Sequence, residues 1–368
     1  YGMGNDAMNQ IGFKVSTGLM SNGWAVTILG SRKWGDGYIQ GTNFNSYNYF
    51  VNVSKRINDA HQLAFTVFGA PQSHFQRSSY DGLSIEGWQN VKDWMDGKSM
   101  YRYNATYGFD RHGKQMSSYY NVYHKPQISL NHTWQINETS SLSTAVYVSV
   151  ASGYGLGGYG RNGYSSSDWY GSSNGVLNTK FRCPDGTFDY AAIQEMNAAS
   201  TTGSNMILAR KNNNHEWYGL VSSYKKEIGQ NNGNKLNITA GLDVRYYIGH
   251  HKNTIENLMD GEYYIDDANR KQIKAYNSSL AGNYNYIYQK LGVGDVVARN
   301  YDGYTAQEGA YAQAEYSMLN KKLNLVLSGA LNNNTYWRRD YFFYDKANER
   351  SETMNFIGGT IKGGANYN

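Results

Sequence analysis

The stretch LNITAGLDVRYY, residues 236–247, decides the fold class of this protein. Alternate residues in it are apolar: Leu236, Ile238, Ala240, Leu242, Val244 and Tyr246. The residues between them form a mostly polar set: Asn237, Thr239, Gly241, Asp243, Arg245 and Tyr247. Alternation with a period of two predicts a β-strand with one face toward an apolar phase and the other toward water. A strand of a soluble β-sandwich shows the same alternation. The rest of the chain has to distinguish a soluble β-sandwich from a membrane barrel.

The same alternation returns along the chain, for example in 127–136 and 142–151. Most of these segments are longer than the roughly 5–6 residues of strands in soluble proteins. They match the about 9–11 residues with which a tilted strand crosses a bilayer, plus an extension beyond it. We therefore predict eleven strands, at about residues 11–20, 24–34, 43–56, 61–71, 125–136, 141–153, 214–228, 236–249, 303–318, 323–336 and 356–368.

The connections between these segments alternate between short and long. The short ones are rich in the Asn, Gly, Asp and Ser that hairpin turns require: 21–23, 58–60, 137–140, 230–234 and 320–322. The long ones are 35–42, 72–124, 154–213, 250–302 and 337–355. Structureless loops beyond about 12–15 residues are uncommon in compact soluble domains. Outer-membrane barrels combine short periplasmic turns with long extracellular loops. The pattern predicts an all-β, up-and-down, antiparallel transmembrane barrel and also gives its orientation.

Composition agrees with a barrel. The mean hydropathy is −0.67, and the chain has 35 Tyr and 41 Gly but only 3 Pro. Only the lipid-facing half of each barrel strand has to be apolar, so low hydropathy is expected. No run of 18 apolar residues offers a transmembrane helix, and few segments have the helical periodicity typical of a soluble enzyme.

Motifs for catalysis or for a cofactor are missing. The lone Cys183 lies in the predicted loop sequence FRCPDG without a partner residue that would make it a nucleophile. His112 and the pair His250-His251 lack a recognisable metal-ligand spacing. The glycine-rich stretch 153–163 does not lie between a buried strand and a helix, so it is interpreted as a flexible loop. We predict no enzyme activity, no cofactor and no metal site. We also predict no nucleic-acid partner, because the net charge is only +5.

Aromatic residues in the long loops are the candidates for ligand binding, because rings offer stacking area with polar edges. The candidates are Trp88, Trp94, Tyr103, Tyr107, Tyr159, Tyr164 and Trp169. The alternative is that such large loops need these rings for their own packing. Within 84–98 we expect a short helix with Ser84 as N-cap.

Four aromatic residues near predicted strand ends are candidates for the belt at the membrane interface. They are Trp24, Trp134, Trp217 and Tyr246. The alternative is that they are ordinary strand aromatics.

Several stretches resemble the TonB-dependent outer-membrane transporters, particularly those of the Bacteroidetes type. They are STGLMSNGWAVTILGSRKWGDGYIQGT (16–42), YFVNVSKRINDAHQLAFTVFGAPQSHFQR (49–77) and YHKPQISLNHTWQIN (123–137). The most specific is FGAPQSHFQR (68–77), at the end of a strand that enters a long loop. The resemblance implies a 22-stranded barrel closed by an N-terminal plug domain.

The chain departs from this pattern. It opens YGMGNDAMNQ without a plug-like region, a TonB box or a signal peptide, and it ends GGANYN without a terminal aromatic residue. The predicted number of strands, eleven, is odd, whereas closed single-chain bacterial barrels have an even number of strands. We therefore expect residues 1–368 to be one partial barrel domain, about half of 22 strands, without the plug domain and the C-terminal strands.

The resemblance implies active, TonB-dependent import of a bulky, scarce nutrient across the bacterial outer membrane. Iron chelates, haem, cobalamin, glycans and peptides are the candidate cargoes. The expected partners are outer-membrane lipid, the TonB complex through a plug domain, and a surface lipoprotein that covers the loops. The alternative is a passive porin or channel, or the pore subunit of a surface complex.

Overall fold

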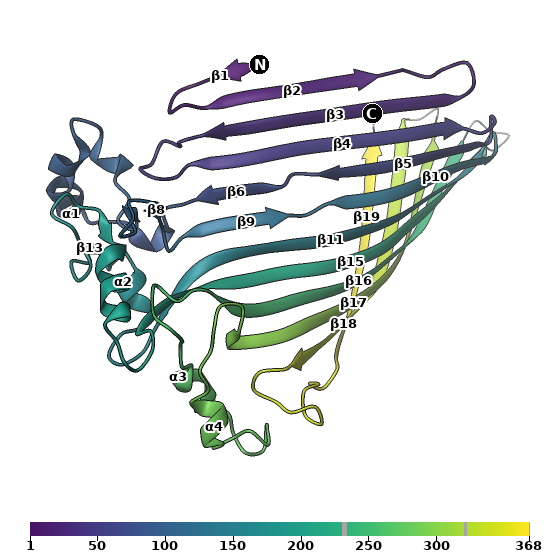
Figure 1. Cartoon of the computed structure of the whole chain (residues 1–368). Coiled ribbons are helices and arrows are strands. Elements are labelled where there is room, and N and C mark those ends of the chain that lie inside the picture. The colour runs from purple at the N-terminus through teal and green to yellow at the C-terminus, as the bar shows by residue number, and fades with distance from the viewer. Residues whose placement is uncertain (230–233, 320–321, 368) are drawn as a thin grey trace.

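A single curved antiparallel sheet makes up most of the molecule (Figure 1). The computed structural model describes residues 1–229, 234–319 and 322–367. Within these described ranges, eleven strand segments follow one another in chain order across the sheet. Their elements are β2 (Asn9–Ser16), β3 (Trp24–Gly35), β4 (Phe44–Arg56), β5 (His61–Gly69), β6 (Gln72–Phe75), β9 (Tyr120–His124), β10 (Gln127–Asn137), β11 (Ser140–Gly160), β15 (Met206–Gly229), β16 (Lys235–Asn257), β17 (Val296–Met318), β18 (Leu323–Asp340) and β19 (Met354–Tyr367).

Two of the eleven segments are interrupted by proline. The pair Tyr49↔Gly69 joins β4 to β5, and Asn45↔Ser73 joins β4 to β6 in the same register. Pro71 lies between β5 and β6, where it cannot donate a hydrogen bond to the ladder. Pro126 separates β9 from β10 in the same way, and both pair with β11. The sequence FGAPQSHFQR is therefore a strand that continues beyond a proline break.

The predicted strands are all present, but several predicted loop boundaries are wrong. β6 and β9 lie inside the predicted loop 72–124, and β11 and β15 extend into 154–213. β16, β17 and β18 likewise extend into predicted loops. The predicted short turns 21–23, 58–60 and 137–140 lie at strand connections, whereas 230–233 and 320–321 fall outside the described residues.

The register divides the sheet into two faces, because residues paired directly across antiparallel strands share a face. One unbroken row across the sheet is Val15, Ile28, Val51, Val67, Ile128, Val148, Tyr218 and Tyr246. We call the face that carries this row the apolar face, and the opposite one, which carries Asp243 and Arg245, the polar face. Much of the apolar face is exposed, for example Val15 at 62% and Leu242 at 52%. Exposed apolar side chains on one side and polar ones on the other are the pattern of a membrane barrel wall.

The long loops hold the hydrophobic clusters and the short elements. The helices are α1 (Ile85–Asn90), α2 (Tyr190–Ala198), α3 (Asp267–Arg270) and α4 (Tyr284–Ile287), and the 3-10 turns are η1 (Ser79–Asp81), η2 (Lys92–Met95), η3 (Met100–Arg102) and η4 (Ser166–Trp169). The short strands are β1 (Gly2–Met3), β7 (Gly108–Phe109), β8 (Gln115–Met116), β12 (Ser172–Ser173), β13 (Val176–Leu177) and β14 (Phe188–Asp189). The predicted helix is confirmed: the Ser84 side chain caps α1 by accepting from Gly87 N at 3.1 Å. Among the described residues, no helix is both long and apolar enough to span a membrane.

Two loop clusters contact opposite faces of the same strand. In β15, Met206 and Leu208 belong to a cluster with Trp169 and Phe188. Their neighbours Ile207 and Ala209 belong to a second cluster, with Ile255, Tyr264, Leu291 and Val297. Successive side chains of a strand point to opposite faces, so this end of β15 lies between two loop layers.

Candidate functional site

Aromatic and cationic side chains gather on the polar face, toward the loop ends of β11, β15, β16, β17 and β18. We call this group the inner wall; its members are Tyr147, His215, Trp217, Tyr247, His251, Tyr301, Tyr336 and Arg338. Four of the rings form a connected series: Tyr147, Trp217, Tyr247 and His215. Tyr147 lies 6.2 Å from Trp217, and Trp217 lies 6.3 Å from Tyr247 in an edge-to-face arrangement.

The inner wall continues on β16 to β18 with charge added to the rings. His251 stacks on Tyr301 with 4.8 Å between ring centroids. The Arg338 guanidinium lies 3.7 Å from the centroid of the Tyr301 ring, within the range of a cation–π contact. Arg338 also forms an ion pair with Asp340.

A cavity of about 350 Å³ opens at this part of the inner wall. Its lining includes Tyr247, His251, Tyr336, Arg338 and the acidic Glu352. Asp340 accepts from one terminal nitrogen of Arg338, so the other guanidinium N–H groups can donate to an anionic group while the rings stack on a flat ligand. Within the described part of the chain, no group of three or more His, Cys, Asp or Glu side chains could hold a metal ion. The wall is therefore suited to hold a ligand through stacking and charge.

The aromatic loop residues predicted as ligand contacts lie in or beside the loop clusters. Tyr103, with Trp88 and Trp94 against it, belongs to one cluster, Trp169 and Tyr164 to a second, and Tyr159 to a third. Tyr107 contacts Phe109 with 5.2 Å between ring centroids. Tyr103 and Trp169 are only 2% and 1% exposed, so they form the framework of the loops. Ligand contact by the others stays a prediction.

The belt candidates separate into two faces. Trp24, Trp134 and Tyr246 lie on the apolar face, and the first two are 40% and 37% exposed. Trp217 pairs with Tyr247 and so lies on the polar face, in the inner wall. Trp217 is therefore on the face opposite to its neighbour Tyr218, and the membrane-interface position of the four residues stays a prediction.

The sequence analysis missed two stacked aromatic residues on the apolar face, Tyr304 and Trp337, and most of the inner wall. Tyr304 and Trp337 stack at 5.1 Å with an interplanar angle of 3°, and Trp337 also contacts Tyr246. Tyr301, Trp337 and Arg338 fell in predicted loops, because the strands were predicted to end too early. Residues 335–339, TYWRR, show no apolar–polar alternation, so the period of two does not extend the last of these strands.

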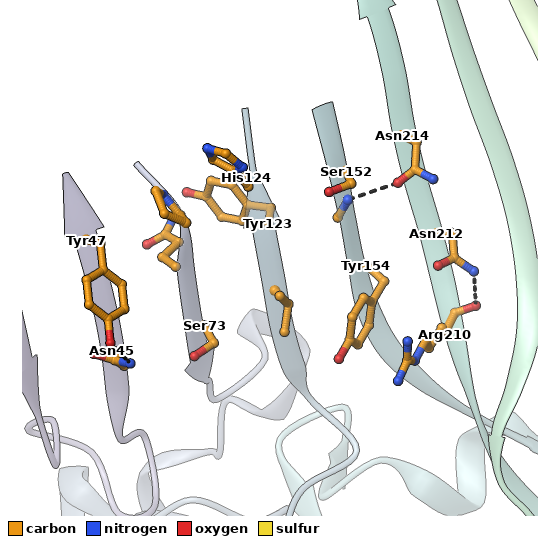
Figure 2. Close-up of a pocket in the computed structure, with 14 residues that line it drawn as sticks. Asn45, Tyr47, Ser73, Tyr123, His124, Ser152, Tyr154, Arg210, Asn212 and Asn214 are labelled. Carbon is orange, nitrogen blue, oxygen red and sulfur yellow. Dashed lines mark hydrogen bonds between the residues drawn. The ribbon is translucent and has the colours of Figure 1, made fainter. Parts of the chain in front are cut away.

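A second cavity, of about 440 Å³, lies at the loop ends of the strands on the apolar face (Figure 2). We call it the outer pocket. Two tyrosines, Tyr47 and Tyr154, flank the pocket in this view. A third tyrosine, Tyr123, is also labelled. The remaining labelled residues are polar: Asn45, Ser73, His124, Ser152, Arg210, Asn212 and Asn214. The side chain of Asn214 accepts from Gly153 N at 2.9 Å and joins two strands there.

The loops also bury a carboxyl group. Asp81 is 1% exposed; its Oδ1 accepts from Gly171 N at 3.1 Å and from Ser172 N at 3.3 Å. Its Oδ2 has no hydrogen-bond partner. Burial raises the pKa of Asp81, against the attraction of the cations Arg182 and Arg77. The carboxyl therefore keeps its proton to a higher pH in the folded loop than in the unfolded chain.

The raised pKa predicts that the loop is more stable in acid. The contribution of Asp81 is fully present below the ordinary pKa of 3.8 and is lost as pH rises through the raised pKa. Hydrogen exchange at Gly171 and Ser172, corrected for the intrinsic rate, should show protection falling from about pH 4 to pH 7. The variant Asp81→Asn should show a flatter profile. Identical profiles for both proteins would contradict this assignment.

Several solved structures have a fold similar to that of this chain. No protein-family model matches the chain, and no curated protein does. Among solved structures, the ferric citrate transporter FecA in its unliganded form aligns with a TM-score of 0.62 at 8% identity, over 99% of this chain and 40% of the transporter. The ferric-catecholate import receptor Fiu from K12 E. coli, in its closed form, aligns with a TM-score of 0.61 at 10% identity, over 100% of this chain and 47% of the receptor. The ferripyoverdine receptor of the outer membrane of Pseudomonas aeruginosa aligns with a TM-score of 0.59 at 11% identity, over 99% of this chain and 39% of the receptor.

The chain thus spans less than half the length of these three proteins. At such low identity the likeness concerns the fold: a curved antiparallel all-β wall with long loops, of the kind found in these receptor barrels.

Proposed function

We propose that this protein is the barrel wall of a TonB-dependent receptor in a bacterial outer membrane, and that it imports an anionic ferric chelate. The inner wall carries the proposal. It places the Arg338 guanidinium, 3.7 Å from the Tyr301 ring centroid, on the polar face beside a cavity of about 350 Å³. Ferric chelates with carboxylate or catecholate donors carry negative charge that matches the guanidinium, and catecholates add a flat ring that matches the aromatic side chains. The names of the three similar receptors all include such a cargo.

We further propose that the sheet is about half of a barrel of 22 strands. Within the described residues, the sheet runs from β1 to β19 without pairing between these ends. A sheet edge left open in lipid leaves backbone N–H and C=O groups without partners, which costs several kcal/mol for each group. Further strands are therefore needed to close the wall, and outer-membrane lipid would contact its apolar face.

Import would involve no covalent chemistry. The inner wall and the loops would bind the chelate, and a plug domain outside these residues would connect the site to the TonB complex. An energised conformational change would then open the path. A surface lipoprotein over the long loops remains a prediction without a contact in this structure to support it.

Cellular uptake tests the proposal. Cells that produce the intact protein should accumulate ⁵⁵Fe from ferric citrate or ferric catecholate chelates, and a protonophore should abolish accumulation while leaving binding at the surface unchanged. A passive pore would continue to equilibrate its solute under the protonophore, and that result would overturn active import.

The variant Arg338→Gln tests the inner wall. Losing a charge-assisted contact should raise the dissociation constant of the ferric chelate by about tenfold or more. The fold should tolerate the change, because Asp340 keeps two backbone donors, Phe342 N at 3.0 Å and Phe343 N at 2.8 Å. Lys362→Gln removes a charge from the polar face of β19 and is the control. Equal affinities for the two variants would exclude Arg338 from the site.

A further inference from the structure

The outer pocket lies on a face that should contact lipid. Its side chains follow those of the apolar row by even steps along the same strands: Ser152 and Tyr154 after Val148 and Val150, and Asn214 and Asn212 after Tyr218. Asn45 and Tyr47 follow Val51 in the same way. The pocket is therefore on the outside of the wall, opposite the inner wall, and a transported ligand in the barrel interior would not reach it.

The position along the strand gives the depth of the pocket in the membrane. On β11 the apolar face ends at Val150, and the next residue on that face is Ser152. Each residue advances a strand by about 3.3 Å, so Ser152 and Tyr154 stand roughly 7 and 13 Å beyond Val150 along the strand, or about 5 and 9 Å along the membrane normal at a tilt of about 45°. The polar layer on each side of a bilayer is about 5–8 Å thick, the difference between its full thickness and its hydrocarbon core. The pocket thus starts at headgroup depth.

The lining fits a phosphorylated sugar. Tyr154 and Tyr47 offer ring faces, and amides and hydroxyls beside them can donate to and accept from sugar hydroxyl groups. The Arg210 guanidinium lies 4.4 Å from the Tyr154 ring centroid, and it is paired with Glu256. Its charge is thereby largely matched.

A second guanidinium, that of Arg32, does not line the pocket itself but contacts two residues that do, Asn45 and Tyr47. Arg32 is exposed on the apolar face, and its Nε donates to Asn45 Oδ1 at 2.9 Å. Its guanidinium carbon lies 4.6 Å from the Trp34 ring centroid and 5.5 Å from that of Tyr47. Within the described part of the chain, Arg210 forms an ion pair with Glu256 and Arg32 forms none, so the Arg32 guanidinium can bind an anionic group.

We propose that the outer pocket binds the phosphorylated sugar headgroup of an outer-leaflet glycolipid, with Arg32 on the phosphate and the two tyrosines beside the sugar. The proposal shares the outer-membrane location with the proposed function but does not depend on import. A bound glycolipid would hold β4, β6, β9, β11 and β15 together at the membrane surface, where Pro71 and Pro126 interrupt the ladder.

Binding of purified lipopolysaccharide to the intact protein in detergent tests the proposal. The probes are lipopolysaccharide, the same lipid after phosphatase treatment, and phosphatidylglycerol, which has phosphate without the sugars. Ser152→Phe should fill the pocket and weaken lipopolysaccharide binding by at least about tenfold. Ser143→Phe places the same ring on the polar face of β11 and should leave binding unchanged.

Arg32→Gln should also weaken binding, by about tenfold. Removing the lipid phosphates should weaken binding to the wild-type protein but change little for Arg32→Gln, because the contact is already lost. Lys33→Gln removes a neighbouring charge from the polar face and is the matched control. The idea is wrong if Ser152→Phe binds as tightly as Ser143→Phe, or if phosphatidylglycerol binds as tightly as lipopolysaccharide. Ferric-chelate uptake is measured separately, so either proposal can fail alone.

Discussion

Replacing Trp169 with alanine is expected to lower the stability of the loop layer by about 3–5 kcal/mol, the range for deleting a buried aromatic side chain. Trp169 is 1% exposed and packs in the cluster of Phe188, Tyr190 and Leu208. Its Nε1 donates to the carbonyl of Tyr159 at 2.9 Å, which connects the loop to β11. Alanine would leave a cavity and remove that connection as well.

The loss should be local to the loops. The cluster is formed mostly by residues 161–205 and the end of β15, while the sheet below is held by its continuous backbone ladder. Hydrogen exchange should accelerate in 161–205 and stay slow in 236–247. Tyr170→Ala removes an adjacent ring that is 39% exposed and is the control. Unchanged protection of 161–205 in Trp169→Ala would show that the cluster does not organise the loop.

The alternation within 236–247 predicted its strand correctly because the two faces of the strand differ in polarity. Leu242 lies on the apolar face and Asp243 on the polar face, so the period of two is visible in the sequence. The strand ends near residue 208 lack this signal. Ile207 and Leu208 are both buried, in two different loop clusters on opposite faces, so neighbouring residues are apolar alike. A strand between two protein layers cannot be told from a loop by alternation.

The site was predicted less well, because aromatic content does not distinguish a framework from a binding surface. Tyr103 and Trp169 met the criterion for ligand contact, yet they are buried inside loop clusters. Trp217 and Tyr218 are adjacent aromatic residues near one strand end, and only the cross-strand register assigns one to each face. The inner wall is formed by side chains from neighbouring strands. Which strands are neighbours cannot be predicted from a local sequence pattern.

A charge on the apolar face should damage the barrel itself. Leu242→Arg, at a position 52% exposed between Ser222 and Ala310 on the neighbouring strands, should lower the free energy of unfolding by about 2–4 kcal/mol in lipid. The cost arises because a guanidinium loses its hydration in hydrocarbon. In water the same substitution would be nearly neutral, because Leu242 is exposed and an exposed charge keeps its hydration.

Gln313→Arg provides the matched control, since Gln313 lies on the polar face of β17 between Thr239 and Ser328. That side chain would remain in water, and its cost should stay within about 0.5 kcal/mol. Urea titration of both variants in lipid vesicles measures the difference directly. Equal losses for the two variants would mean that the apolar face does not contact lipid, and a larger loss for Gln313→Arg would reverse the orientation of the whole wall. A large loss confined to Leu242→Arg would show that the row from Val15 to Tyr246 is the membrane-facing surface, on which both the inner wall and the outer pocket depend for their positions.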